Sequence, residues 1–258
     1  WRCGWLLRAL IAWRRGEGVG GVVLCGSAGG MAYLAPDERL KLFAVGVEAV
    51  RGRVPVVAGT GYPNTRETLY TTRAAEALGV DAAMVVTPYY YPLDDEALLD
   101  HYRAVAEATA LPVLVYNMPP LTHVHLSPEQ VGALARIEGV AGIKDSAGDL
   151  SQLRRTLAVV PPGFCTLTGS FPMLPEAVAA GAAGAILAMA NLIPAACVSI
   201  AREAAAGRLD AACDLRDEFD HLQQWIKRHG IPGIKHRLAE WHHPAGWPRA
   251  PLRPLRAR

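Results

Sequence analysis

Seven short apolar runs, rich in β-branched residues, recur along the chain and constrain its fold more than any other feature. They cover residues 21–25, 54–59, 82–88, 112–117, 140–144, 164–169 and 184–189. The runs begin roughly 20 to 35 residues apart, which is the length of one strand plus one crossover helix. They are apolar almost throughout and do not alternate with polar residues. The chain therefore predicts an α/β fold built on a parallel sheet covered on both faces.

Helical patterns lie between these runs, with start signals at Ala35, Asn64, Ser127 and Asp149. Seven strand–helix units, with no Gly-x-Gly-x-x-Gly turn after the first run, favour a closed (β/α)8 TIM barrel over a doubly wound sheet. The count is one strand short, and a helix expected over 5–15 stands where the first crossover helix belongs. We expect an N-terminally incomplete barrel over 1–207, lacking its first strand, with extra C-terminal helices and a tail over 208–258.

Charge and cysteine content exclude several classes of partner. The 258 residues carry 26 basic and 24 acidic side chains, a net charge of +2, and the basic residues are scattered, so no nucleic acid partner is expected. The five cysteines form no C-x-x-C pair, which predicts free thiols in a reducing compartment. The longest apolar stretch, 177–201, is broken by glycines, Asn191 and Pro194, so no membrane span is expected. These features indicate a cytoplasmic protein.

A single lysine ends one of the buried strands. In a parallel barrel the C-terminal ends of the strands converge on the active site. Lys144 alone follows an apolar strand, and helical patterns contain the other three lysines, Lys41, Lys227 and Lys235. Burial disfavours an ammonium ion, and the free amine can then attack a ketone to form a Schiff base. The alternative interpretation is a lysine that snorkels from the strand end or pairs with Asp145.

Two further strand ends can reach the same space. Tyr116 closes the run 112–117, and a phenol beside an amine can transfer protons while a carbinolamine forms and a C–C bond breaks. Alone, a tyrosine at a strand end is more often a core residue with a satisfied hydroxyl. The turn CGSAGG, residues 25–30, follows the first run, and its amides and the Ser27 hydroxyl can hold a carboxylate. Without the lysine and the tyrosine, a tight strand–helix connection would explain this turn.

A metal site is a weaker alternative. His123 and His125 form a His-x-His pattern of a kind that binds zinc, but they follow a proline-rich turn and have no evident carboxylate partner. The pair His242–His243 indicates a surface position. The acidic run 94–96 stands where a helix begins, so capping explains it.

Together, these motifs resemble a known family. Tyr116 in YNMP, Lys144 28 residues later in GIKDS, TPYY one strand earlier and a Gly-Ser-x-Gly turn near the start are similar to the dihydrodipicolinate synthase and N-acetylneuraminate lyase family of class I aldolases. The resemblance runs from about Gly18 to Leu255. Within the family, GVDAAMVVTPYYY, IKDSAGD and RHGIPGIK look closest to 4-hydroxy-2-oxoglutarate aldolase.

The resemblance implies a role for each matching position. Lys144 would form the Schiff base with the 2-keto carbon, Tyr116 would relay protons, and Ser27 would hold the substrate carboxylate. Tyr90 matches the catalytic tyrosine that family members insert into a neighbouring subunit's site, which implies a homo-oligomer, either a dimer or a tetramer of dimers. The substrate-binding positions implied are Ser27, Ala28, Ser146, Gly169 and Ile186.

Three positions depart from the family pattern. Gly30 replaces the usual glutamate after the Gly-x-x-Gly turn, and Ala28 lacks the hydroxyl that synthases carry there for the relay. Leu121 stands where dihydrodipicolinate synthases have an arginine for the second substrate's carboxylate. The family's first strand, with a Thr-Pro-Phe run, is not matched.

The resemblance and these departures lead to one expected function. We expect a class I aldolase that cleaves a 4-hydroxy-2-keto acid, of the 4-hydroxy-2-oxoglutarate type, to pyruvate and an aldehyde such as glyoxylate. The rivals are a synthase or dehydratase that uses the same lysine on another 2-keto acid, and a non-catalytic keto-acid-binding paralogue. The partner implied is a small-molecule 2-keto acid, with no metal and no organic cofactor. A eukaryotic 4-hydroxy-2-oxoglutarate aldolase would be mitochondrial.

Overall fold

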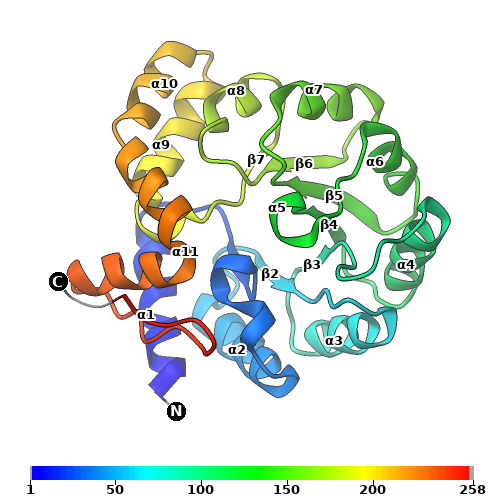
Figure 1. The fold of residues 1–258 in the computed structure, drawn as a ribbon, viewed down its shortest axis with the longest axis horizontal. Helices are drawn as coiled ribbons and strands as arrows, with labels where there is room; N and C mark the ends of the chain where they lie inside the picture. Colours follow the sequence, from blue (N-terminus) through cyan, green and yellow to red (C-terminus); the bar gives the residue numbers. More distant parts are fainter. Residues whose placement is uncertain (1, 256–258) are drawn as a thin grey trace.

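A curled parallel sheet organises the computed structural model, which describes residues 2–255 (Figure 1). Its strands follow chain order and every neighbouring pair is parallel, so β1 and β7 are the two edges of the sheet within the described residues. The strands are β1 Val22–Leu24, β2 Val56–Gly59, β3 Ala82–Val86, β4 Val113–Asn117, β5 Val140–Asp145, β6 Cys165–Thr168 and β7 Gly184–Ala185. The predicted parallel α/β architecture is confirmed, and each of the seven apolar runs contains a strand.

Helices alternate with the strands and surround the sheet, as Figure 1 shows for α3, α4, α6, α7 and α8. The α-helices are α1 Arg2–Gly16, α2 Pro36–Val50, α3 Thr65–Ala77, α4 Asp95–Glu107, α5 Pro119–Thr122, α6 Pro128–Leu134, α7 Leu150–Val159, α8 Leu174–Ala179, α9 Pro194–Ala205, α10 Leu209–Asp217 and α11 Asp220–Glu240. Short 3-10 helices are η1 Ser27–Gly29, η2 Met31–Tyr33 and η3 Met189–Asn191. The helix expected over 5–15 is α1.

The predicted start signals cap their helices. A side-chain oxygen accepts a hydrogen bond from the backbone N–H three residues later at each of Asn64, Asp94, Ser127 and Asp149. Ala35 has no such oxygen, and there Glu38 reaches back to accept from the Ala35 N–H at 3.0 Å. Each cap satisfies a helix donor that would otherwise lack a partner and stabilises the helix by about 1 kcal/mol. Capping by Asp94 confirms the interpretation of the acidic run 94–96.

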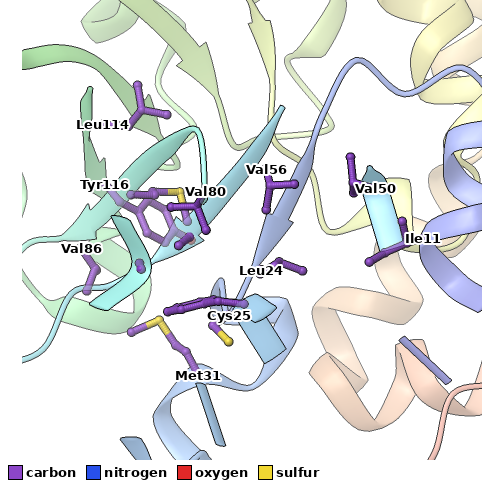
Figure 2. Close-up of a cluster of buried hydrophobic side chains, with 14 residues drawn as sticks. Ile11, Leu24, Cys25, Met31, Val50, Val56, Val80, Val86, Leu114 and Tyr116 are labelled. Atoms are coloured by element: carbon purple, nitrogen blue, oxygen red, sulfur yellow. The ribbon is translucent and has the colours of Figure 1, made fainter. Parts of the chain in front are cut away.

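Two hydrophobic clusters fill the space around the first five strands. One contains side chains from α1, α2 and the strands β1 to β4. Its members include Leu24 of β1, Val56 of β2 and Tyr116 of β4 (Figure 2). The other packs β3, β4 and β5 against α4 and α6, with Tyr102 fully buried at its centre. Strands β3 and β4 are therefore covered on both faces, as their largely apolar sequences predict.

The edge strands are less well covered. Both Gly184 and Ala185 of β7 are only half-buried, as are the first two residues of β1, whereas every residue of β4 is buried. The run 184–189 predicts a full strand, but β7 ends at Ala185. We attribute the difference to its position, because a strand with one neighbour has half the ladder hydrogen bonds. A closed eight-stranded barrel would place one more strand between β7 and β1, and the described residues supply seven.

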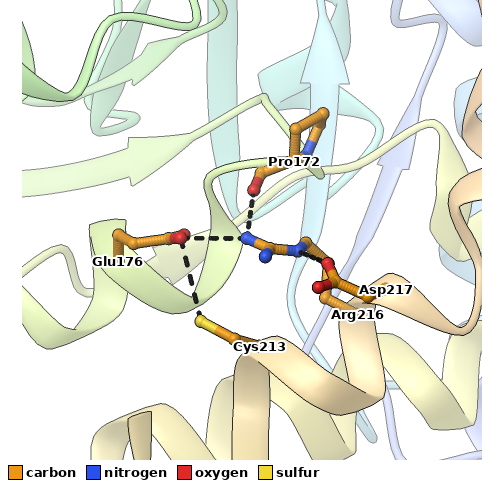
Figure 3. Close-up of polar contacts among 5 residues, drawn as sticks. All are labelled: Pro172, Glu176, Cys213, Arg216 and Asp217. Atoms are coloured by element: carbon orange, nitrogen blue, oxygen red, sulfur yellow. Dashed lines mark hydrogen bonds and ion pairs between the residues drawn. The ribbon is translucent and has the colours of Figure 1, made fainter. Parts of the chain in front are cut away.

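The C-terminal helices pack against the side of the sheet that carries α8 and α9. Arg216 of α10 donates hydrogen bonds to the Pro172 carbonyl at 2.7 Å and to Glu176 Oε1 at 2.9 Å, and its Nε donates to Asp217 Oδ1 at 2.6 Å (Figure 3). Helix α11 is interrupted at Gly230, which has non-helical backbone angles. Beyond α11, the His243 ring stacks on Trp13 of α1 at 3.8 Å, so the tail lies against the N-terminal helix.

Two sequence expectations concern membrane-spanning helices and the state of the cysteines. Among residues 2–255, no helix combines the length and the apolar character needed to cross a membrane. The cysteines whose side chains are described, Cys25, Cys165, Cys197 and Cys213, are all free thiols.

His101 makes the fold sensitive to acid. Its Nδ1 lies 2.9 Å from Thr65 Oγ1, and burial lowers the pKa of the ring from 6.5 to about 4. Because the unfolded chain takes up this proton first, the free energy of unfolding falls as the pH drops from about 6.5 towards 4, by roughly 2 kcal/mol at pH 5. In His101→Gln this contribution is lost, so calorimetry should show a smaller decline in Tm between pH 7.5 and pH 5. The exposed His221→Gln should keep the wild-type decline, and an equally steep decline in His101→Gln would contradict the assignment.

Candidate functional site

Lys144 and Tyr116 lie side by side at the C-terminal ends of β5 and β4. The strand register places Tyr116 opposite Lys144, so both side chains leave the same face of the sheet. Lys144 is 7% exposed and Tyr116 is 2% exposed. The Lys144 Nζ atom lies 3.9 Å from the centre of the Tyr116 ring. The two strand-end residues that the sequence singled out are thus brought into direct contact.

The carboxylate of Asp145 lies on the opposite face of β5 from Lys144. Successive strand residues point to opposite faces, so Asp145 is directed away from the Lys144 side. Its Oδ1 accepts hydrogen bonds from the Asn117 amide and from the Ala147 N–H, each at 2.9 Å. The interpretation of Lys144 as the ion-pair partner of Asp145 is therefore wrong.

The turn after β1 also reaches the face of the sheet that carries Lys144 and Tyr116. Ser27, in η1, is half-buried, and its Oγ lies 3.1 Å from the Tyr116 hydroxyl. The two residues are 89 positions apart in the sequence, and the parallel order of the strands brings them together. Lysine amine, tyrosine ring and hydroxyl, and serine hydroxyl thus form one continuous row.

Ser146 and Gly169 complete the surroundings of the lysine. A Cβ atom added to Gly169 would lie 1.8 Å from Ser146 Oγ and 3.1 Å from Lys144 Cε. The backbone at Gly169 therefore touches both side chains, and a side chain at this position has no room. Ile186, whose N–H donates to the Thr168 carbonyl at 2.9 Å, packs at the border of the cluster that contains Tyr116.

Tyr90 does not join this group within the single chain. Its side chain is 83% exposed, and its ring meets that of Tyr91 edge-on at 4.9 Å. The backbone of Tyr90 has φ 91°, a left-handed conformation that is unfavourable for a bulky residue. Strain of this kind, in an exposed loop after a barrel strand, is typical of residues with a function.

The positions that depart from the family pattern have structural explanations of different kinds. Gly30 has φ 76° at the end of η1, a conformation that a glutamate rarely adopts. Ala28 packs beside Leu192 and Leu238 in the cluster that α11 forms with η3. Leu121 is 61% exposed, and its side chain has no hydrogen-bonding group.

Two of the histidines that the sequence offers as metal ligands, His125 and His243, contact other side chains. The Nε2 atom of His125 is hydrogen-bonded to Gln152 Oε1, and His123 is exposed in a left-handed conformation. His243 stacks on Trp13. In the part of the chain that the structure describes, no three His, Cys, Asp or Glu side chains form a group that fits a metal ion.

Arg39 is a buried charge that the sequence analysis missed. It is 2% exposed, donates to the Met31 carbonyl at 2.9 Å and the Gly61 carbonyl at 3.2 Å, and lies 3.9 Å over the Tyr62 ring. It thereby ties the loops after β1 and β2 together behind the site. Its helical spacing from the buried residues Phe43, Gly46 and Val50 was the available sign that it faces the core.

The comparisons place this geometry among known proteins. The model of the dihydrodipicolinate synthetase family matches residues 4–258. The 4-hydroxy-tetrahydrodipicolinate synthase of Sphingopyxis alaskensis is 37% identical over 235 residues, covering 90% of this chain and 80% of the relative. That of Rhizorhabdus wittichii is 34% identical over 252 residues, covering 94% and 87%. A solved dihydrodipicolinate synthase from Acinetobacter baumannii, complexed with pyruvate, has a TM-score of 0.94 at 32% identity, covering 98% of this chain and 87% of that one.

Crowding at Gly169 yields a test of the site. In Gly169→Ala the added methyl group would displace Ser146 and press on Lys144, because it would lie 1.8 Å from one and 3.1 Å from the other. A misplacement of about 1 Å costs a reaction on the order of 10²-fold, so borohydride trapping of pyruvate on the protein should slow by roughly 10- to 100-fold. Gly16→Ala, where no heavy atom lies within 4 Å of the new Cβ, is the matched control. Trapping by Gly169→Ala at the rate of the control would show that this backbone does not border the amine that pyruvate modifies.

Proposed function

The chain belongs to the dihydrodipicolinate synthetase family, and from that membership we propose that it is a Schiff-base-forming class I aldolase. Its substrate would be a 4-hydroxy-2-keto acid of the 4-hydroxy-2-oxoglutarate type, cleaved to pyruvate and an aldehyde such as glyoxylate. One observation carries the proposal: Lys144 Nζ lies 3.9 Å from the ring of Tyr116, whose hydroxyl lies 3.1 Å from Ser27 Oγ. Imine formation and retro-aldol cleavage need a nucleophilic amine and a group that moves protons beside it.

Lys144 begins the proposed reaction. Its neutral amine attacks the C2 carbonyl of the keto acid, and the nitrogen passes one proton to the C2 oxygen to give a carbinolamine. The Tyr116 hydroxyl donates a second proton to that oxygen, which leaves as water. Lys144 and C2 are then joined as a cationic iminium, and Tyr116 is a phenolate. Ser27, in contact with the phenol, holds the substrate carboxylate through its hydroxyl and amide.

Bond cleavage uses the same tyrosine in the opposite direction. The Tyr116 phenolate takes the proton of the C4 hydroxyl, the C3–C4 bond breaks, and its electrons form an enamine with the Lys144 nitrogen. C4 leaves as the aldehyde carbon. Tyr116 then returns that proton to C3 and is a phenolate again. Water adds to the iminium carbon, pyruvate and the free amine are released, and the proton set free by this hydrolysis restores the Tyr116 hydroxyl. Tyr116 and Lys144 end in the protonation states in which they began.

One feature of the site favours cleavage of a small hydroxy acid. Ser146 Oγ occupies the space beside Lys144 Cε and Gly169, where it can bond a hydroxyl near the reacting carbons. Leu121 is exposed and has no donor for a carboxylate at the far end of a substrate. Both 4-hydroxy-2-oxoglutarate and aspartate semialdehyde carry such a carboxylate, so the missing partner, which costs about 1–3 kcal/mol or more, does not by itself separate cleavage from condensation.

A second candidate is a condensing synthase that uses the same lysine. The names of the relatives from Sphingopyxis alaskensis and Rhizorhabdus wittichii, both 4-hydroxy-tetrahydrodipicolinate synthases, favour it. In that reaction the enamine of pyruvate attacks aspartate semialdehyde, so the first half of the mechanism is shared. The two candidates therefore share their first steps, and a substrate comparison separates them.

We also propose that the active form is a homo-oligomer in which Tyr90 enters the site of a second copy. The exposed ring, its strained backbone and the adjacent exposed Tyr91 support this arrangement. Exposed Leu93 and Leu121 follow β3 and β4 and extend the apolar surface at the same end of the strands. A phenol supplied by the second copy would extend the row formed by Tyr116 and Ser27.

The first test traps the intermediate. Incubation with pyruvate and borohydride should add one reduced pyruvyl unit, and peptide mapping should find it on Lys144, whereas Lys144→Ala should gain none. Cleavage of 4-hydroxy-2-oxoglutarate should then outpace condensation of pyruvate with aspartate semialdehyde. Lys41→Ala, which removes an exposed lysine of α2, is the control and should behave as the wild type. Faster condensation would favour the synthase, and no adduct at all would favour a non-catalytic binding protein.

The second test concerns assembly. The wild type should sediment as a dimer or tetramer, and Tyr90→Ala should lower kcat because the second copy no longer supplies a phenol. The double variant Tyr90→Ala/Tyr91→Ala should also weaken association, since it removes the exposed aromatic pair. Tyr70→Ala, another exposed tyrosine on α3, is the matched control and should change neither property. A wild type that is monomeric at all concentrations and fully active would contradict the proposal.

A further inference from the structure

Asp145 is a buried carboxylate that the proposed reaction does not use. It is 5% exposed, and burial raises its pKa, while hydrogen bonds from the Ala147 N–H and the Asn117 amide oppose the rise. His125 also opposes the rise, and the nearby Asp149 adds to it. Burying a carboxylate is costly unless hydrogen bonds compensate. Asp145 therefore depends on its hydrogen-bond partners to remain buried next to Lys144.

The contacts of Asp145 link two strands and two loops. Through Oδ1 it accepts from Asn117 Nδ2, at the end of β4, and from the Ala147 N–H, in the loop after β5. Both contacts measure 2.9 Å. Asn117, which is completely buried, uses its own Oδ1 to accept from the Leu126 N–H at 3.3 Å. One carboxylate and one amide therefore join β4, β5 and the segments that follow them.

A third side chain closes this network from α7. Gln152 Nε2 donates to the Leu126 carbonyl at 3.0 Å, and Gln152 Oε1 is bonded to His125. The Gln152 backbone N–H is held by Asp149. Both loops that border the candidate site, the one carrying Leu121 and the one carrying Ser146, are thus fixed from behind by buried polar groups. In a low-dielectric interior such bonds are strong when every member has a partner.

We infer that Asp145 and Asn117 form a positioning pair, whose hydrogen bond holds the ends of β4 and β5 so that Tyr116 and Ser146 stay beside Lys144. The inference rests on the proposed function of Lys144 and Tyr116. The pair lies one residue beyond the register match of Tyr116 with Lys144, and Asn117 is itself matched to Asp145. Its members touch no reacting atom, because they point to the helix side of the sheet.

Exchanging Asn117 and Asp145, singly and together, tests whether their hydrogen bond positions the site. Asn117→Asp removes the donor and sets two carboxylates against each other, so kcat should fall on the order of 10²-fold. Asp145→Asn keeps an acceptor for Asn117 and for Ala147 and should stay within a few-fold of the wild type. The double variant Asn117→Asp/Asp145→Asn restores a donor–acceptor pair with reversed polarity. It should recover most of the kcat lost in Asn117→Asp, with KM changed much less than kcat in all variants.

The readouts separate this inference from the proposed function. Asp149→Asn removes an exposed charge four residues away and keeps a capping oxygen, so it should match the wild type. Amide hydrogen exchange at Leu126 and Ala147 should be faster in Asn117→Asp and slow again in the double variant, whether or not any substrate is turned over. If the wild type forms no pyruvate adduct, the proposed function fails while the exchange data still test the pair. A double variant no better than Asn117→Asp in both exchange and kcat would overturn the inference, as would an Asn117→Asp variant with wild-type kcat.

Discussion

The register between β4 and β5 decides which side chains meet at the candidate site. Val113 lies opposite Val140, but the register then shifts by one residue, so that Tyr116 lies opposite Lys144. Without this bulge Ile143 would face Tyr116, and Lys144 would point to the helices. The packing shows the shift directly, because Val140 and Ile143, three residues apart, belong to the same cluster against α4 and α6. The contact between amine and phenol therefore depends on one extra residue in β5.

Close backbone contacts preserve this arrangement. A Cβ atom on Gly142, just after the shift, would lie 2.4 Å from the Cys165 carbonyl oxygen and 2.9 Å from Leu114 Cδ2. Gly169, on β6's C-terminal side, is equally confined by Ser146 and Lys144. Side chains at either glycine would push β6 away from β5 or displace the lysine. The absence of two side chains is thus as important to the site as the presence of Lys144 and Tyr116.

Local patterns in the sequence were sufficient for the strands, the helix starts and the position of Lys144 at a buried strand end. Apolar runs, capping residues and a lone lysine at a strand end each depend on a few neighbouring residues. The bulge, the partner of Asp145 and the burial of Arg39 depend on contacts between segments far apart in the chain. The alternative pairing of Lys144 with Asp145 failed for a local reason, because neighbouring residues in a strand point to opposite faces of the sheet. The exposure of Tyr90 and its left-handed backbone likewise have no signature in the letters TPYYY.

Side chains along a strand alternate between its two faces, and this explains how Lys144 and Asp145, neighbours in the sequence, can both contribute to one site. A carboxylate within reach of an amine favours the charged form, which is not nucleophilic. Because Asp145 leaves β5 on the helix side and is held there by Asn117 and Ala147, it can stiffen the strand end without forming that ion pair. The inner face then offers Lys144 an aromatic ring and hydroxyl groups in place of a carboxylate. Strand geometry, more than distance along the chain, keeps the proposed nucleophile available.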